Sequence, residues 1–391
     1  MNNLIKYGID NYLQKLSLSR KKKYIAGIVC NQASVTSDLK YSHIELNKLL
    51  EIKYIFSPQH GFFCAEQANM IETKNSIDSL SGIKIVSLYS STRKINEKYL
   101  KQIDYLIFDL QDVGSRYYTY LWTLFYCMES CEKTGKKIII LDRPNIINGN
   151  DLEGYTILEG YNSFVGLYPV LQRYGLTIGE FALMLKRLKF KNADLEIVKL
   201  GNWSRKKYFD EYDNHWIPAS PNIPAVNSAV VYPGTCLLEA TNISEGRGTT
   251  RPFEIIGAPF IDARLLTKEI ISFKIQGAVF RPLLFKPTFD KFKNEVCSGV
   301  FIHITDRKKF RPLRMALIII YLLKKFYPDQ FKWYAGAYEY EKNKPAIDIL
   351  YGSDSFRNTV DSQTGLGKIF SEIDSEEDKF KKSAKEWRFY K

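Results

Sequence analysis

The sequence is poor in the clusters and motifs that mark metal, redox and nucleotide chemistry. Its six cysteines form no CxxC pair and no paired ligand spacing, which argues against a zinc knuckle or a redox dithiol. With only four histidines, a multi-histidine metal site is not expected. Neither GxGxxG after the first expected strand nor GxxxxGKS/T occurs, and this disfavours a nucleotide-binding enzyme. The absence of GxSxG and HExxH argues against an α/β-hydrolase and a zinc protease.

Long hydrophobic runs are missing as well. The longest apolar run, residues 315–323, is too short to span a bilayer and predicts a core helix. The first residues show neither the long apolar stretch nor the cleavage site of a signal peptide. We therefore expect a soluble, cytoplasmic protein, or a secreted or periplasmic one if the chain has already been processed.

Positive charge, in contrast, is plentiful. The formal net charge of +13 suits an anionic partner such as nucleic acid, a membrane surface or a negatively charged small substrate. Dense basic patches occur only at residues 20–23 and 379–391, outside the most regular segments. A solvated lysine-rich face explains this pattern better, so we expect no nucleic-acid partner and no membrane insertion.

The first part of the chain alternates short β-rich runs with helical patterns. Strands are predicted at residues 24–30, 53–56, 83–88, 105–110 and 137–141, with helices at 41–50, 97–103 and 119–133. Such alternation predicts a parallel sheet covered on both faces. A capping box, Thr177 followed by Glu180, opens a further helix, and residues 195–200 predict one more strand. We therefore predict an α/β fold with a Rossmann-like N-terminal domain over residues 1–228.

The character of the sequence changes after this point. Four prolines, at positions 218, 221, 224 and 233, punctuate an irregular connection that suits a domain boundary. A loop at 244–251, a helix at 262–273, strands at 278–285 and 300–305 and further helices follow. These elements predict a smaller α+β C-terminal domain over residues 229–391.

Polar side chains follow each of the five expected strands of the first domain. They are Asn31-Gln32, residues 60–66, residues 89–93, residues 109–117 and residues 142–145. In an open parallel sheet these ends converge on one edge, where ligands bind. Carboxylates, arginines and aromatic residues are the materials of a carbohydrate site. For single residues a plainer interpretation stays open, since Asp142 beside Arg143 equally suits a surface ion pair or a turn.

Several longer segments point to one protein family. In chain order they are SPQHGFFCAEQ, FDLQDVGSRYYTY, LDRPN, YGLTIGE, PASPNIPAVNSAVVYPGTCLLEATNISEGRGTTRPFEIIGAP and PTFDKF. Together they resemble the bacterial peptidoglycan exo-β-N-acetylmuramidase family, NamZ, from about Gly27 to the C-terminal region. The resemblance implies a Rossmann-like domain, a smaller domain and an active-site cleft between them. It also implies release of N-acetylmuramic acid from the non-reducing end of peptidoglycan fragments in cell-wall turnover and recycling.

The resemblance assigns roles to particular positions after the second strand. The family's HG-x(4)-E element falls on His60, Gly61 and Glu66, and Glu66 matches the proposed catalytic glutamate. The family usually has Glu at the position of Gln59 and a small polar stretch at Phe63-Cys64, so these are departures that make the pocket less polar.

The chemistry of glycoside cleavage supports an acid at this place independently. A carboxylic acid must protonate the leaving oxygen, and the apolar neighbours of Glu66 would favour its neutral form. We therefore predict Glu66 as general acid, against the alternative that it only begins or caps a helix. The second group is open: Asp112 as base or nucleophile, Glu245 from the second domain, or the acetamido group of the substrate.

The lactyl carboxylate of muramic acid calls for a cation of fixed geometry, which arginine supplies better than lysine. Arg116, Arg143, Arg247 and Arg251 are the candidates, the last two in the glycine-containing loop 244–251. Tyr117, with Tyr118, Tyr120 and Trp122, is a candidate for stacking on a sugar. The full set of predicted substrate-binding residues is Gln32, Arg93, Arg116, Tyr117, Arg143, Asn222, Glu245, Arg247, Thr249 and Arg251.

The leading hypothesis is thus an exo-acting glycoside hydrolase that acts on peptidoglycan-derived muramyl saccharides and needs no metal or cofactor. One alternative is a muropeptide-binding or sensing protein, in which the departures at Gln59 and Cys64 mark lost turnover. A third hypothesis, a sugar-phosphate or nucleotide enzyme, is disfavoured by the missing glycine fingerprint.

Overall fold

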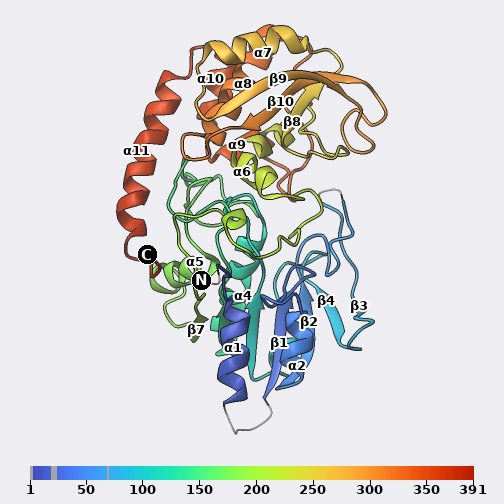
Figure 1. The fold of residues 1–391 in the computed structure, drawn as a ribbon, viewed down its shortest axis with the longest axis vertical. Helices are drawn as coiled ribbons and strands as arrows, with labels where there is room; N and C mark the ends of the chain where they lie inside the picture. The colour runs from blue at the N-terminus through green and yellow to red at the C-terminus, as the bar shows by residue number, and fades with distance from the viewer. Residues whose placement is uncertain (1–2, 19–23, 68–69) are drawn as a thin grey trace.

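The computed structural model describes residues 3–18, 24–67 and 70–391, which form two domains stacked along the long axis of the molecule (Figure 1). The first domain carries a seven-stranded sheet, and the smaller second domain carries a three-stranded one. The basic run at residues 20–23 lies outside the described residues. The α/β class with a smaller second domain, as predicted from the sequence, is confirmed.

The sheet of the first domain is parallel except for a two-residue strand at one edge. In spatial order its strands are β3 (Ser76–Ile77), β4 (Lys84–Ser87), β2 (Glu51–Ser57), β1 (Ile25–Cys30), β5 (Tyr105–Asp109), β6 (Lys137–Leu141) and β7 (Leu195–Val198). The direction of winding reverses between β1 and β5, whose last residues, Cys30 and Asp109, lie opposite each other. A reversal of this kind opens a crevice beyond the carboxyl ends of the strands.

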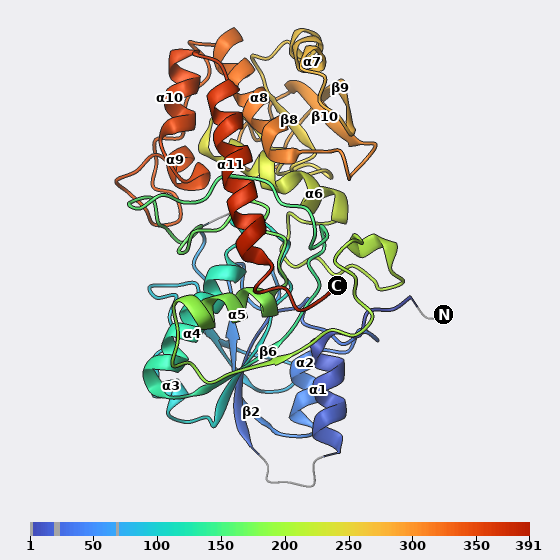
Figure 2. The same ribbon diagram turned by 90° about the vertical axis from the view of Figure 1, so that its left-hand side faces the viewer.

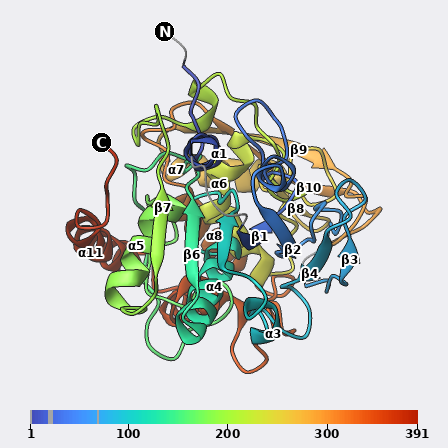
Figure 3. The same ribbon diagram turned by 90° about the horizontal axis from the view of Figure 1, so that it is seen from below.

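Helices cover both faces of this sheet, since its central strands are buried on both sides (Figure 3). One face packs against α1 (Gly8–Ser17) and α2 (Ser42–Asn47), and the other against α3 (Glu97–Leu100), α4 (Tyr120–Thr134) and α5 (Ile178–Leu188). The predicted capping box is confirmed, because the Thr177 hydroxyl accepts from the Glu180 amide and the Glu180 carboxylate accepts from the Thr177 amide. α1 precedes the first predicted element and was missed.

The second domain is built on three antiparallel strands in the order β8 (Ile255–Ala258), β10 (Cys297–Ile304) and β9 (Ala278–Phe285). Its helices are α6 (Val226–Thr235), α7 (Ala263–Ser272), α8 (Pro312–Phe326), α9 (Ala346–Tyr351), α10 (Ser355–Ser362) and α11 (Gly367–Ala384), and the 3₁₀ turns of the chain are η1 (Phe209–Glu211) and η2 (Cys236–Ala240). The predicted helix and two strands are confirmed, whereas the short apolar β8 was missed. The boundary predicted between residues 228 and 229 falls within α6 and stays a prediction. Every described helix is too short or too polar to cross a membrane.

The last residues of the chain return to the first domain. α11 descends beside it, and the end of the chain lies near α5 (Figure 2). There the Tyr390 hydroxyl donates to Asp142 Oδ2 over 2.7 Å, and Asp142 also accepts the Gly179 amide, 2.7 Å away, and the Thr177 hydroxyl, 2.8 Å away, at the start of α5. Burial raises the pKa of Asp142 to about 7. A surface position for Asp142 beside Arg143 is therefore wrong, because both side chains are buried.

Candidate active site

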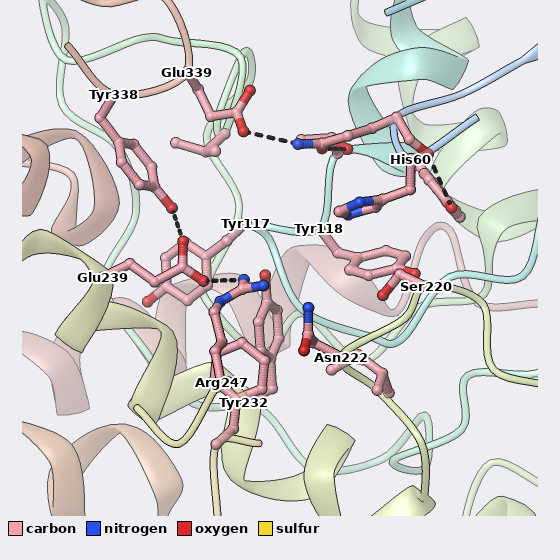
Figure 4. Close-up of a pocket in the computed structure, with 16 residues that line it drawn as sticks. His60, Tyr117, Tyr118, Ser220, Asn222, Tyr232, Glu239, Arg247, Tyr338 and Glu339 are labelled. Atoms are coloured by element: carbon pink, nitrogen blue, oxygen red, sulfur yellow. Dashed lines mark hydrogen bonds and ion pairs between the residues drawn. The ribbon is translucent and has the colours of Figure 1, made fainter. Parts of the chain in front are cut away.

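A cavity lies at the junction of the two domains, beyond the carboxyl ends of the first sheet (Figure 4). The first domain lines it with residues that follow β2 and β5, and the second domain with α6, η2 and the loops around Arg247 and Glu339. The residues labelled in the close-up are His60, Tyr117, Tyr118, Ser220, Asn222, Tyr232, Glu239, Arg247, Tyr338 and Glu339. Both domains must therefore be in place for the cavity to exist.

His60 reaches the cavity through an uncommon backbone conformation. It adopts φ +68° and is followed by Gly61 at φ +76°, so the chain turns sharply away from β2. His60 Nδ1 lies 2.7 Å from the main-chain oxygen of Glu66. Because a carbonyl only accepts, Nδ1 carries the proton and Nε2 is an acceptor when the ring is neutral. Burial lowers the pKa of His60 to about 4, so the ring is neutral near pH 7.

Glu66 takes part in this arrangement through its main chain. Its carbonyl oxygen orients the His60 ring, while its half-buried side chain is not among the residues that line the cavity. Cys64 is buried, with its Sγ 3.3 Å from the Ala219 oxygen, and Phe63 is exposed. Of the two departures from the family pattern, only Gln59 lines the cavity. The role of Glu66 as general acid stays a prediction.

Two glutamates line the cavity, and neither was predicted from the sequence. Glu239 is the penultimate residue of η2; its Oε1 lies 2.8 Å from Arg247 Nη2, and its Oε2 accepts the Tyr338 hydroxyl over 2.6 Å. Glu339 is 4% exposed; its Oε1 accepts the Gln59 amide over 2.9 Å, and its Oε2 accepts the Tyr89 hydroxyl over 2.7 Å. The cavity thus holds one carboxylate paired with a guanidinium and one carboxyl whose direct partners are neutral.

Arg247 belongs to a buried network of charges in the predicted loop 244–251. Besides Glu239, its Nε lies 3.0 Å from Glu245 Oε1, and Lys291 Nζ lies 2.9 Å from Glu245 Oε2. Burial alone would raise the pKa of Glu245, but Lys291 and Arg247 hold it below the usual range. Elsewhere in the loop, the Thr249 hydroxyl donates to the Gly246 oxygen over 2.6 Å, and the Arg251 side chain is half exposed.

Arg93, from the loop after β4, is not among the residues that line the cavity, but its charge acts on the Glu339 carboxyl, where burial raises the pKa and Arg93 lowers it. Its guanidinium carbon is 3.2 Å from the ring centroid of Tyr340 and 5.6 Å from those of Tyr89 and Phe164. Its Nε and Nη2 atoms are buried and have no hydrogen-bond partner among the described residues. A cation held in this way by aromatic faces is oriented without being neutralised.

Several predicted site residues lie elsewhere. Arg116 is fully buried and donates to four main-chain carbonyls, and Arg143 pairs with Asp109 over 2.7 and 2.9 Å. Asp112 is buried against Tyr174, and burial raises its pKa to about 6. Gln32 is half-buried and contacts the Pro218 oxygen at 3.4 Å. None of these four residues lines the cavity, because strand ends also carry contacts of the core, and their roles in the site stay predictions.

The predicted aromatic residues divide between cavity and core. Tyr117, Tyr118 and Tyr120 line the cavity, whereas Trp122 is fully buried and donates its indole N–H to the Arg116 oxygen over 2.8 Å. The second domain adds the rings of Tyr232, Tyr338 and Phe253. Asn222, also predicted, lines the cavity and is anchored by its donation to the Gln67 oxygen over 2.9 Å.

A second, wider cavity of about 430 Å³ shares Glu239 and Tyr338 with the first. Its other lining residues are Met70, Thr241, Asn242, Glu245, Asp290, Lys291, Phe292 and Tyr334. Within the described ranges, no group of three or more His, Cys, Asp and Glu side chains is placed to hold a metal ion.

Sequence reasoning missed Glu239 and Glu339 for different reasons. Glu239 stands in the same segment as Arg247, LLEATNISEGRGTT, which is part of the family resemblance, and its position there was a usable signal. Glu339 lies in a stretch predicted only as helical, between two tyrosines. Its position next to Gln59 arises from tertiary contacts 280 residues apart in sequence, which no local pattern reveals.

Comparison with known proteins adds the following similarities. Residues 26–227 match the model of the N-terminal domain of the exo-β-N-acetylmuramidase NamZ, and residues 230–390 match that of its C-terminal domain. The chain is 38% identical over 388 residues to the peptidoglycan β-N-acetylmuramidase NamZ of Bacillus subtilis (strain 168), covering 99% of this chain and 91% of that protein.

Two crystal structures of DUF1343 family proteins from Bacteroides fragilis NCTC 9343 are also similar. One superposes with a TM-score of 0.89 at 29% identity and covers 100% of both chains. The other has a TM-score of 0.73 at 25% identity and covers 99% of both chains. The similarity therefore extends across both domains and the junction between them.

Proposed function

The chain belongs to the NamZ family of exo-β-N-acetylmuramidases, and on this premise we propose that it is a glycoside hydrolase that releases N-acetylmuramic acid from the non-reducing end of peptidoglycan fragments. Its place is in cell-wall turnover and recycling. The observation that carries the proposal is the junction cavity, where two buried glutamates have opposite surroundings. Glycoside cleavage uses such a pair, one carboxyl to give a proton and one anion to stabilise positive charge on the sugar.

The walls of the cavity suit a sugar ring. Tyrosine rings supply flat apolar faces against which the C–H groups of a pyranose pack, and Asn222 and Ser220 supply polar atoms for its hydroxyl groups. The neutral His60 ring offers Nε2 as an acceptor, which suits an acetamido N–H or a hydroxyl. The first cavity has a volume of about 30 Å³ and the second of about 430 Å³, so we assign the saccharide to the wider cavity, with its terminal sugar at the place where the two meet, beside Glu239 and Tyr338.

The lactyl carboxylate needs a cation whose charge is not already balanced by a carboxylate of the protein. Arg247 stands between two carboxylates, so its charge is largely balanced. Arg93 makes no ion pair with a described residue, and its neighbours are aromatic rings. Of the predicted arginines, Arg93 is therefore our choice for the lactyl group.

Substrates that differ only in the lactyl ether test both the proposed hydrolysis of muraminides and the proposed role of Arg93. Purified protein is incubated with a chromogenic β-N-acetylmuraminide and with the matching N-acetylglucosaminide. We expect hydrolysis of the first and little of the second, and Arg93→Met should lower the ratio of the two kcat/KM values at least tenfold. Saturable binding of the muraminide without turnover would instead mark a sensor. An unchanged ratio in Arg93→Met would remove Arg93 from the lactyl site.

A further inference from the structure

Glu339 is held in the cavity by a strained backbone. Glu339 and Tyr340 adopt φ +45° and +70°, in the left-handed region that costs a side-chain-bearing residue energy. The turn is fixed by paired hydrogen bonds between the main chains of Tyr338 and Glu341, and the Glu339 amide lies 3.2 Å from Met70 Sδ. Strain that the surrounding structure maintains is characteristic of functional positions. Here its result is a carboxyl aimed at the end of β2.

The partners of the Glu339 carboxyl are fixed in direction. The Thr119 hydroxyl donates to Gln59 Oε1, so the Gln59 amide nitrogen faces Glu339 and donates to Oε1. The Tyr89 hydroxyl donates to Oε2. Each carboxyl oxygen accepts one hydrogen bond and keeps a second lone pair. A proton on that second site leaves both existing hydrogen bonds intact.

Glu339 and Glu239 have different partners in the cavity. Burial raises the pKa of Glu339 to about 7, outweighing its two donors, which act in the opposite sense. Glu239, in contrast, pairs with the Arg247 guanidinium over 2.8 Å. The titratable and charged groups that face Glu339 are Tyr89, Tyr338, Tyr340, Glu239, Arg93 and His60.

We propose, on the basis of the function assigned above, that Glu339 is the general acid that protonates the glycosidic oxygen. The C1–O bond breaks, its electron pair stays on the leaving oxygen, and the Glu339 proton moves to that oxygen. Water supplies the hydroxyl group that bonds to C1, and its remaining proton returns to the Glu339 carboxylate. The guanidinium-paired carboxylate of Glu239 faces the positive charge that develops on the sugar.

Substrates with different leaving groups separate an acid from a positioning group. The 4-nitrophenolate of a 4-nitrophenyl muraminide leaves readily without protonation. The N-acetylglucosamine of the disaccharide MurNAc-GlcNAc is a poor leaving group and requires a proton on its oxygen. Glu339→Gln is isosteric, and its amide matches the Tyr89 hydroxyl, which both donates and accepts. We expect kcat/KM to fall at least 100-fold for the disaccharide and tenfold or less for the nitrophenyl substrate. Glu72→Gln, which removes an exposed carboxylate near Tyr340, serves as the matched control and should leave both rates unchanged.

The pH profile gives a second measurement that a structural role would not change. Wild-type activity on the disaccharide should fall as pH rises through about 7, where the Glu339 proton is lost. Gln59→Met removes a donor that stabilises the Glu339 anion, so this alkaline limb should move to higher pH.

The possible results distinguish the proposals from each other. Wild-type protein that cleaves neither substrate overturns the proposed function. If the wild type is active but Glu339→Gln slows both substrates equally, Glu339 is not the proton donor. A leaving-group-dependent loss in Glu66→Gln, with full activity in Glu339→Gln, would assign the acid to Glu66 instead. Circular dichroism of each variant verifies that it is folded.

Discussion

Arg116 offers the sharpest test of whether a buried arginine binds substrate or holds the fold together. Its Nη1 donates to the carbonyls of Tyr155 and Val170 over 2.7 and 2.9 Å, and its Nη2 donates to those of Leu350 and Tyr351 over 2.5 and 3.0 Å. The first two belong to the segment before α5 and the last two to the end of α9. The side chain therefore ties the second domain to the first, at a helix C-terminus where a cation is favourable.

Replacement of Arg116 by Met keeps the aliphatic stem and removes every donor. Four buried carbonyls then lose their partners, at about 1 kcal/mol each at the low end of the usual range. The low end applies because the variant no longer carries the cost of burying the guanidinium. That cost is visible in the pKa of Arg116, which burial lowers to about 10. We expect the free energy of unfolding to fall by about 4 kcal/mol. We also expect loss of a single cooperative transition, since the lost contacts join two domains.

Urea unfolding followed by circular dichroism and tryptophan fluorescence measures both effects, with the exposed Arg264→Met as control. The control should change stability by about 0.5 kcal/mol or less. A free energy of unfolding of Arg116→Met that lies within about 1 kcal/mol of the wild-type value would refute the reasoning. If such a stable variant also showed a raised KM for muraminides, Arg116 would be a substrate-binding residue, as the sequence suggested.

Three further variants test other parts of the structure. Arg143→Met leaves the buried Asp109 carboxylate without its cation and should cost about 3 kcal/mol or more in urea unfolding. Gly248→Ala places a methyl group 2.7 Å from main-chain atoms at a residue with φ +75°. It should lower the free energy of unfolding by about 2 kcal/mol more than Gly160→Ala does, because Gly160 has φ +90° but open space around it. Equal shifts in the melting temperatures of the two variants would contradict this. His60 has a pKa lowered to about 4 from 6.5, so the unfolded chain binds more protons between these values and stability falls as pH drops across that window; His60→Asn should lose about 3 kcal/mol of this dependence.

The parallel sheet was predictable because its signals are local. Apolar runs of strand length, bounded by helices with recognisable caps such as Thr177, are enough to place its main strands. Elements without such signals were missed. β8 is only four residues long, and α1 lies ahead of the first strand. The irregular residues between β6 and α5 carry no periodicity, yet they hold two of the carbonyls bound by Arg116.

The site was predictable only to the level of strand ends. His60 follows β2 and does reach the cavity, as the position of a polar residue after a parallel strand indicates. The same rule also selected Arg143, because a strand end carries core ion pairs as well as ligand-binding groups. Glu339 comes from the other domain, and its burial against Gln59 depends on how the domains meet. Residue type and local order do not contain that information.

The hydrogen bond between Tyr390 and Asp142 bears on how the protein is made. A ribosome releases β6 and α5 long before residue 390, so the first domain emerges with a buried acid that lacks one of its partners. Until the last residues have been synthesised and have packed against the first domain, Asp142, which accepts hydrogen bonds from the start of α5, lacks its hydrogen bond from Tyr390. The first domain thus gains all its stabilising contacts only after the C-terminal end has been translated. In stalled or shortened chains, the first domain should therefore be more easily cleaved by proteases.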